Sequence, residues 1–229
     1  MSPGMPASQK RPSWQKKRTV QTVRKRQGRG KIYLLGAFII IVVVGVTLYV
    51  YASSQSTPAV LYAKLVTSQG QIEIELYQNA TPKTVTNFVN LARSGFYNNL
   101  VWHRIAKNFV IQTGDPNTRN AGGNNITWGK GGSSQTVPLE VVSSLQNTAG
   151  YVGMARVGND LNSGTSQFYI NLNDNRAALD GKYTVFGKVI GGMNVAYTLG
   201  SLPVYTPPDG QPITPSNAML TSVTISDSP

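Results

Sequence analysis

The 229-residue sequence contains no cysteine and a single histidine, His103. The absence of cysteine excludes disulfides, thiolate nucleophiles, zinc–cysteine sites and lipidation through cysteine. With one histidine, a zinc site of the usual kind lacks ligands, and serine–histidine–aspartate catalysis would have to centre on His103. Because His103 stands in an apolar stretch between Trp102 and Arg104, we interpret it as a hydrogen-bonded structural residue. The alternative is a hydrolase that uses His103 with Ser163 or Ser166.

Acidic residues are absent from residues 1–31, which contain ten lysines and arginines. The chain has a net charge of +12, but only eleven of its 21 basic residues lie beyond this segment, against all nine acidic ones, which leaves +2. The segment holds few large apolar residues and cannot bury a core, so we expect a disordered, basic, cytoplasmic segment. Its charge could bind nucleic acid, or it could determine membrane topology and attract anionic lipid. We favour the membrane role and predict no specific nucleic-acid partner.

Charge is also absent from residues 32–51, a run of 20 residues dominated by isoleucine and valine. At about 1.5 Å per residue, a helix of this length spans roughly 30 Å, the thickness of a bilayer core. Basic residues stay on the cytoplasmic face, so we predict one transmembrane helix with the N-terminus cytoplasmic and the rest extracytoplasmic. The alternatives are a buried core segment and a signal peptide cleaved near Ala52, although signal peptides usually have shorter apolar runs.

Residues 52–58 are small and polar and predict a linker, and residues 59–229 form the folded domain. Residues 61–67 and 71–76 alternate as in an antiparallel hairpin with one solvent-exposed face. Residues 82–94 show helical spacing, with Thr81 as the expected N-cap and Pro82 in the first turn. Residues 117–134 are rich in glycine and asparagine and predict a long surface loop. Further short apolar runs, separated by Gly, Asn and Asp, indicate a closed antiparallel sheet: residues 100–105, 109–113, 151–155, 167–171, 184–190 and 219–225.

Five short blocks carry a resemblance to a known family: residues 102–105 (WHRI), 108–115 (NFVIQTGD), 153–156 (GMAR), 165–170 (TSQFYI) and 179–189 (LDGKYTVFGKV). In order and approximate spacing they resemble the cyclophilins, which are peptidyl-prolyl cis-trans isomerases. The resemblance covers essentially the whole folded part. It implies a mainly β fold, an eight-stranded antiparallel closed β-barrel capped by two helices, with the active groove on the outer face of the barrel.

The resemblance also implies roles for particular residues. Arg104 is similar to the catalytic arginine, and Gln112 to the residue that holds a substrate carbonyl. The catalytic set is Arg104, Gln112 and Phe109, and the substrate-binding set is Val110, Ala155, Arg156, Tyr169, Leu179 and Tyr183. Within these sets Phe109, Val110, Tyr169 and Leu179 resemble the proline pocket, and Ala155 and Arg156 the strand that pairs with substrate. No cofactor or metal is expected, because the reaction only rotates a C–N bond.

Several positions depart from the usual pattern of the family. Val110 stands in place of methionine, Tyr169 of phenylalanine, Ala178 of tryptophan, Tyr183 of histidine and Arg156 of asparagine. The small Ala178 and Val110 predict a shallower pocket and weak binding of cyclosporin. The sequence therefore predicts a monomeric prolyl isomerase that acts on proline-containing peptides and unfolded extracytoplasmic proteins. The alternative is a non-catalytic proline-peptide binding module or chaperone.

Overall fold

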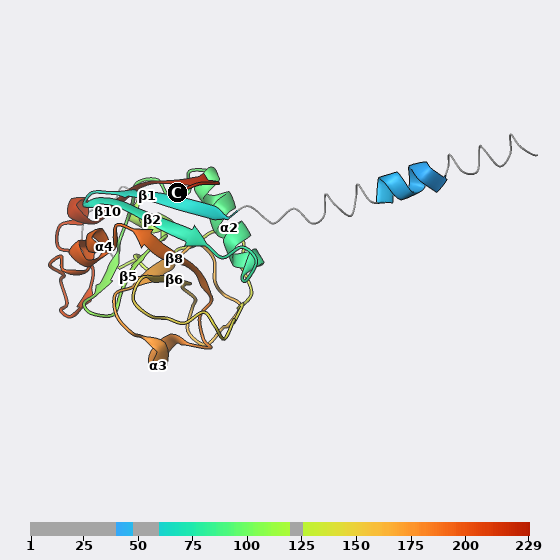
Figure 1. The fold of residues 1–229 in the computed structure, drawn as a ribbon. Helices are drawn as coiled ribbons and strands as arrows, with labels where there is room; N and C mark the ends of the chain where they lie inside the picture. Colours follow the sequence, from blue (N-terminus) through green and yellow to red (C-terminus); the bar gives the residue numbers. More distant parts are fainter. Residues whose placement is uncertain (1–39, 48–59, 120–125) are drawn as a thin grey trace, which may run out of the picture. The chain divides into compact units, whose positions relative to one another are not determined.

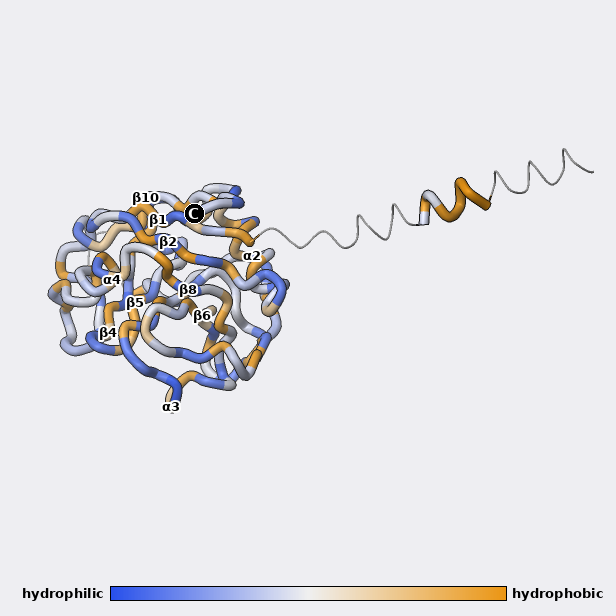
Figure 2. The backbone as a smooth tube through the Cα atoms, in the orientation of Figure 1, coloured by the Kyte–Doolittle hydropathy of each residue, from blue (hydrophilic) through white to orange (hydrophobic). Residues whose placement is uncertain are grey.

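The computed structural model describes residues 40–47, 60–119 and 126–229. The chain divides into two compact units, Met1–Ser56 and Thr57–Pro229. In the first unit residues 40–47 are helical, and Figure 2 colours most of them hydrophobic. Within the described ranges, no helix combines the length and the apolar character needed to cross a membrane. The predicted basic segment, the linker and most of residues 32–51 lie outside the described residues.

The folded unit opens with the predicted hairpin. Strand β1 runs over Leu61–Thr67 and pairs antiparallel with β2, Gly70–Leu76. The isoleucines and the leucine of β2 are buried, whereas its two glutamates stay partly exposed, as the alternation predicted. Gly70 has a φ of +130°, which a residue with a Cβ rarely adopts, and this explains why a glycine closes the turn.

Ten strands form one curled antiparallel sheet within the described residues (Figure 1), in the order β3-β10-β1-β2-β8-β6-β7-β5-β4-β9. The remaining bounds are β3 Leu100–Val101, β4 Arg104–Ala106, β5 Val110–Thr113, β6 Tyr151–Met154, β7 Phe168–Asn171, β8 Val185–Gly191, β9 Asp209–Gly210 and β10 Met219–Ser226. This order has two ends. The expected closed barrel of eight strands is therefore corrected to a curled sheet of ten strands.

One expected strand, over residues 100–105, is two strands in the structure. β3 pairs with β10 at one end of the sheet order, and β4 pairs with β5 and β9 at the other. Between them lie only Trp102 and His103, and the Trp102 N–H donates to the Ala218 carbonyl at 2.8 Å. Two residues thus connect the first strand of the order with the last but one, which requires the sheet to curl back on itself.

Two helices pack against the curled sheet at opposite ends (Figure 1), and both contribute to the same core. Helix α2, Pro82–Arg93, contacts β10, and α4, Met193–Gly200, contacts β2, β4 and β5. They are the two capping helices that the resemblance implied. A third, α3, is a single turn over Arg176–Leu179. Helix α2 ends one residue before the predicted end, and its buried face holds Val85, Phe88, Val89 and Ala92.

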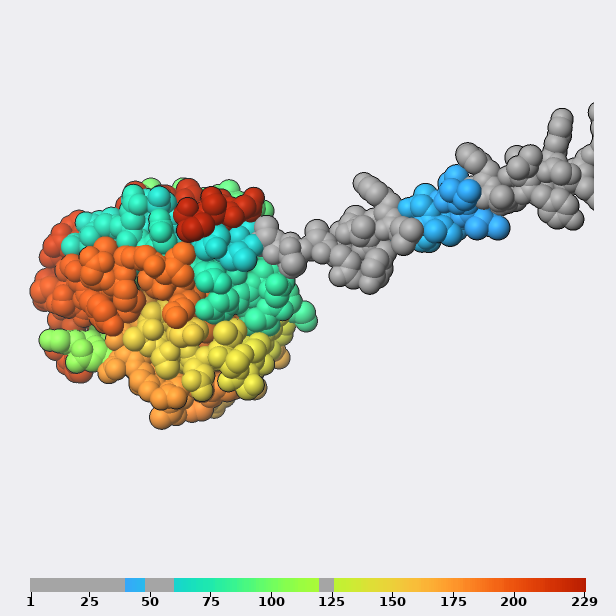
Figure 3. Space-filling view, viewed as in Figure 1, coloured from blue at the N-terminus to red at the C-terminus, as the bar shows by residue number. Residues whose placement is uncertain are grey.

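The start of α2 differs from the simple cap that the sequence suggested. Thr81 occupies the N-cap position, but its hydroxyl donates to the Tyr77 carbonyl instead of accepting from the helix. The Glu140 carboxylate accepts from the backbone N–H groups of Lys83 and Thr84, at 3.1 and 2.8 Å. Figure 3 shows the segment around residues 140–160, in yellow, adjoining α2, in green. A loop distant in sequence therefore supplies the cap.

The core is built on aromatic rings, and it determines which face of the sheet carries the site. Phe88 of α2 lies 5.3 Å from both Phe168 and Phe186, and Trp102 lies 5.9 Å from Phe168, between ring centroids. Successive residues of a strand point to opposite faces, so Phe168 enters this core while Tyr169 joins a second apolar cluster. The candidate site forms around that second cluster.

Candidate active site

The register of three neighbouring strands brings the polar residues together. Arg104 of β4 pairs directly with Gln112 of β5, and Gln112 pairs with Tyr169 of β7. Directly paired residues project from the same face of a sheet, so these three side chains form a row across the strands. Residues 65 positions apart in the chain are thus neighbours.

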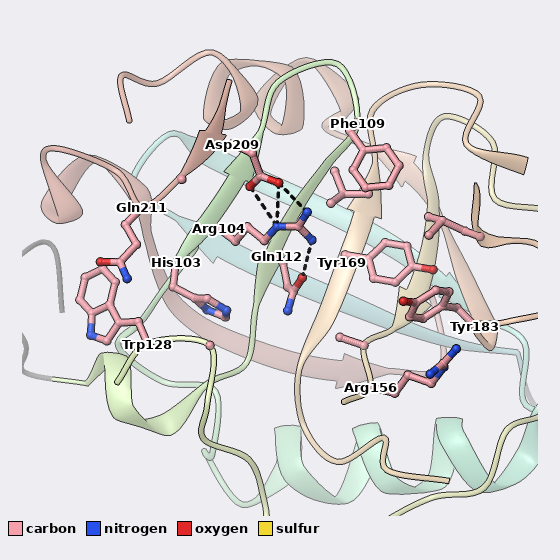
Figure 4. A pocket seen from close by; sticks show the side chains of 15 residues that line it. His103, Arg104, Phe109, Gln112, Trp128, Arg156, Tyr169, Tyr183, Asp209 and Gln211 are labelled. Atoms are coloured by element: carbon pink, nitrogen blue, oxygen red, sulfur yellow. Dashed lines mark hydrogen bonds and ion pairs between the residues drawn. The ribbon is translucent and has the colours of Figure 1, made fainter. Parts of the chain in front are cut away.

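This row lines a groove with a volume of about 520 Å³ (Figure 4). All nine residues that the sequence assigned to catalysis or substrate binding line it. Six more were not assigned to the site: His103, Trp128, Gly129, Asp209, Gly210 and Gln211.

The apolar part of the groove is a small cluster beside the main core. Val110, Tyr169 and Leu179 are buried, and Phe109, Ala155 and Tyr183 pack against them. The Tyr169 and Tyr183 rings meet edge to face, with centroids 5.9 Å apart. A Cβ on Gly153 would overlap the Tyr169 ring, so the glycine allows this ring to lie flat against β6. The result is an apolar slot along one part of the groove.

The hydroxyl that distinguishes Tyr169 from phenylalanine is satisfied behind the slot. It donates to Asn147 Oδ1 at 2.7 Å, and the Asn147 side chain donates to Asp180 at 2.9 Å. Burial, with the nearby Tyr183 and Asp180, raises the pKa of Tyr169 well above its ordinary value, so the phenol is a neutral donor. The polar network therefore fixes the ring that forms the back of the slot.

The charged side of the groove is formed by Arg104. Its Nη1 donates to Gln112 Oε1 at 3.3 Å, and its guanidinium carbon lies 5.9 Å from the centre of the Phe109 ring. Gln112 is oriented in turn by Gln167, which accepts from Gln112 Nε2 at 2.8 Å. On its other edge the guanidinium is bound by Asp209, at 2.6 to 3.2 Å. A cation thus stands at the edge of the apolar slot.

Arg156 forms the opposite wall instead of a second charged centre. Its guanidinium carbon lies 4.7 Å from the centre of the Tyr183 ring, and its Nε donates to the Lys182 carbonyl at 2.7 Å. It also donates to the Gly158 carbonyl. Ala155 follows the last residue of β6, and its N–H is already donated to the Gln167 carbonyl.

His103 lines the groove as well, which strand alternation from Arg104 did not predict, because the strand breaks at this residue. The residue is 3 % exposed, as expected of a structural histidine. Neither ring nitrogen has a partner of strict hydrogen-bond geometry within the described residues, although the Gln167 side chain and the Val101 backbone interact with the ring and favour its protonated form. Burial lowers its pKa to about 4, against the opposing effect of Asp115, so the ring is neutral at pH 7.

The family is decided by the comparison with known proteins. The model of the family described as "Cyclophilin type peptidyl-prolyl cis-trans isomerase/CLD" matches residues 62–225, more than half of the chain and nearly all of the folded unit. The chain belongs to the cyclophilin family. The five sequence blocks and the groove that they line are therefore those of a cyclophilin-type domain.

Relatives support the same assignment. The chain is 42 % identical over 146 residues to "Peptidyl-prolyl cis-trans isomerase-like 2" of Rhizopus delemar, a match that covers 62 % of this chain and a quarter of that protein. It is 42 % identical over 135 residues to "Peptidyl-prolyl cis-trans isomerase-like 1" of Emericella nidulans, covering 58 % and 78 %. It is 40 % identical over 153 residues to the isomerase ppi1 of Schizosaccharomyces pombe, covering 66 % and 92 %.

A solved structure shares the fold. The crystal structure of a Cryptosporidium parvum cyclophilin-type peptidyl-prolyl cis-trans isomerase, determined in the presence of the dipeptide Ala-Pro, aligns with a TM-score of 0.61 and 30 % identity. The alignment covers 72 % of this chain and 98 % of that one.

Two elements of the cyclophilin groove carried no clear signal in the sequence. Trp128 is the one aromatic residue of a polar, glycine-rich loop, and this setting was the only sign in the sequence that it is buried. In the structure it is 6 % exposed. Asp209 follows two prolines in a segment without strand alternation, 105 positions from the arginine that it binds.

Proposed function

We propose that this cyclophilin catalyses the cis–trans isomerisation of X-Pro peptide bonds in unfolded or partly folded proteins, with Arg104 as the catalytic residue. The observation that carries the proposal is the Arg104 guanidinium at the edge of the apolar slot formed by Val110, Tyr169 and Leu179. The proline ring occupies the slot. The peptide bond before it then lies beside the guanidinium and Gln112.

The reaction needs a polar group in this place because of the electronic structure of the amide. Its rotational barrier of about 18–20 kcal/mol comes from resonance between the nitrogen lone pair and the carbonyl. In the twisted state the lone pair localises on the prolyl nitrogen, where it becomes a hydrogen-bond acceptor. A donor that is positioned for that state stabilises it more than the planar ground state, and this lowers the barrier.

The residues around Arg104 assist the proposed reaction in two ways. The apolar walls exclude water from one side of the guanidinium and strengthen its interaction with the substrate. Gln112, oriented by Gln167, holds the carbonyl of the residue before proline. A barrier lowered by about 7 kcal/mol would bring a reaction of tens to hundreds of seconds to about a millisecond.

The test is a refolding reaction that is limited by proline isomerisation. Catalytic amounts of the purified full-length chain should accelerate the slow refolding phase of a substrate protein, and the Arg104→Ala variant should lose most of this acceleration. Peptide binding without acceleration by the wild-type chain would identify a non-catalytic proline-peptide binding module instead.

We further propose that residues 32–51 anchor the chain in a membrane, with the N-terminus cytoplasmic and the isomerase domain extracytoplasmic. The sequence supports this proposal: 20 residues without charge follow a segment with ten basic and no acidic residues. The clients would then be exported or membrane proteins whose folding is delayed at proline. We also propose that the domain acts on them as a monomer.

A further inference from the structure

On one edge, Arg104 is bound by a carboxylate that no sequence pattern placed there. Asp209 Oδ1 and Oδ2 accept from Arg104 Nε at 3.0 and 3.2 Å, and Oδ2 accepts from Nη2 at 2.6 Å. This is the two-point geometry in which the planar guanidinium faces a carboxylate along one edge (Figure 4). The contact fixes the plane of the guanidinium as well as its distance.

The backbone places Asp209 there. β9 pairs with β4 so that Asp209 stands opposite Ala106, two residues from Arg104 on the same face of the strand. Arg104 is therefore the diagonal neighbour of Asp209, within reach of long side chains. Ala106 is small and leaves the space above it to the ion pair. The Lys107 N–H donates to the Pro208 carbonyl at 2.8 Å, which holds the residue before Asp209 against the same strand.

The five N–H groups of Arg104 are thereby divided between two sides. Nε and one hydrogen of Nη2 face Asp209, and Nη1 contacts Gln112. The remaining hydrogens of Nη1 and Nη2 lie on the edge away from the carboxylate. We propose that Asp209 is a positioning residue for catalysis, which holds the guanidinium so that this edge is presented to the prolyl nitrogen. The inference rests on the proposed function.

The ion pair with Asp209 matters because the Arg104 side chain is long and flexible, and 39 % of it is exposed. Without a fixed partner the guanidinium would rotate among several positions before each turnover. Orientation that is established before substrate binds removes that entropic cost from the transition state. Substrate affinity, which depends on the apolar slot, does not need the ion pair.

The chain offers a matched control in a second ion pair. Arg176 donates to Asp174 with the same pattern, Nε at 2.9 and 3.1 Å and Nη2 at 2.7 Å, and with similar exposure. Neither residue lines the groove. The variants Asp209→Ala and Asp174→Ala therefore remove equivalent pairs, and only the first should affect catalysis.

The experiment measures kcat and KM of the full-length chain on an Ala-Pro tetrapeptide, with the Arg104 Nε–H signal followed by NMR. Asp209→Ala should lower kcat about tenfold, with KM within about twofold of wild type. Its Nε–H signal should move to the position of a solvated arginine. Asp174→Ala should match wild type. In the Arg104→Ala background, removal of the Asp209 carboxylate should have no further effect.

The outcomes separate the two proposals. An inactive wild-type chain would overturn the proposed function itself. An active wild type and an inactive Arg104→Ala variant, combined with an Asp209→Ala variant as fast as wild type or faster, would overturn only the positioning role. The positioning role would also be overturned if Asp209→Ala lowered the unfolding midpoint more than Asp174→Ala did and left kcat per folded molecule at the wild-type value. Asp209 would then have a purely structural role.

Discussion

At the scale of single residues, the groove combines the Arg104 guanidinium with an apolar slot whose buried hydroxyl is hydrogen-bonded behind the surface. Tyr169 shows how this is done, since its hydroxyl is bound by Asn147 and its ring faces the slot. Arg156 contributes its flat face to Tyr183 instead of a free charge. In the proposed function, Arg104 is the cation whose donors face the bound proline.

Replacing Tyr169 with phenylalanine tests the role of the buried hydroxyl. The change removes the 2.7 Å hydrogen bond to Asn147, so the free energy of unfolding should fall by about 1 kcal/mol. The ring remains, so KM should stay within about twofold. Tyr183→Phe is the control, because its hydroxyl makes no hydrogen bond within the described residues. Equal urea-denaturation midpoints for the two variants would contradict the assigned role of the hydroxyl.

His103 makes stability depend on pH. The buried ring has a pKa of about 4 in the native state, against 6.5 when solvated, so the unfolded state binds the proton first as the pH falls. This contribution is fully present above pH 6.5 and is lost between about 6.5 and 4. Between pH 7.5 and 5 it amounts to about 2 kcal/mol.

The measurement is urea unfolding at pH 7.5 and pH 5 for wild type and His103→Gln. The variant should be less stable overall but should lose less stability on acidification. Identical losses for both proteins would contradict the burial of a neutral imidazole. Because the native ring titrates near pH 4 and takes no part in the proposed reaction, kcat/KM should show no step near pH 4, whereas a hydrolase centred on His103 would show one there.

At the scale of elements, the hairpin β1–β2 and helix α2 could be predicted because each has a repeat that is visible in a short window. The strand over residues 100–105 could not be divided correctly, because its two halves pair with different partners and the apolar run continues through Trp102. Strand β9 could not be predicted at all. It has two residues and no alternation, and it exists because the segment after α4 folds back onto β4.

The cap of α2 also depends on a residue that is distant in sequence, and it can be tested. Glu140 accepts two helix N–H groups and the Thr84 hydroxyl, which no local pattern reveals. Glu140→Ala should lower the free energy of unfolding by about 1–2 kcal/mol. Glu73→Ala, which breaks an exposed 3.7 Å pair with Lys64, should cost less than about 0.5 kcal/mol. Both variants should keep full isomerase activity, and equal stability losses would contradict the cap.

At the scale of the whole molecule, we propose separate roles for the folded unit and the N-terminal segment. The nine residues assigned from the sequence blocks lie in one groove because the blocks occupy neighbouring strands and loops. Asp209 and Trp128 come from segments between the blocks, where nothing in the sequence indicated which way the chain would fold. The family resemblance of the blocks thus assigned the slot residues and Arg104, but not the residues that surround them.

Deleting residues 1–51 tests the division between anchor and enzyme. The full chain should sediment with membranes and resist extraction by alkaline carbonate, because residues 32–51 are long and apolar enough for a bilayer core. The shortened chain should be recovered in the soluble fraction with unchanged kcat/KM. Extraction of the full chain by carbonate, or protease protection that places residues 59–229 on the cytoplasmic side, would contradict the proposed topology.

The most direct measurement is the rate of cis–trans exchange in a peptide containing Ala-Pro, obtained by NMR exchange spectroscopy with wild type and Arg104→Ala. Wild type should raise the exchange rate to the millisecond range, and the variant should bind the peptide with similar affinity but catalyse exchange at least about a hundredfold more slowly. Equal exchange rates for the two proteins would show that the Arg104 guanidinium is not what lowers the barrier.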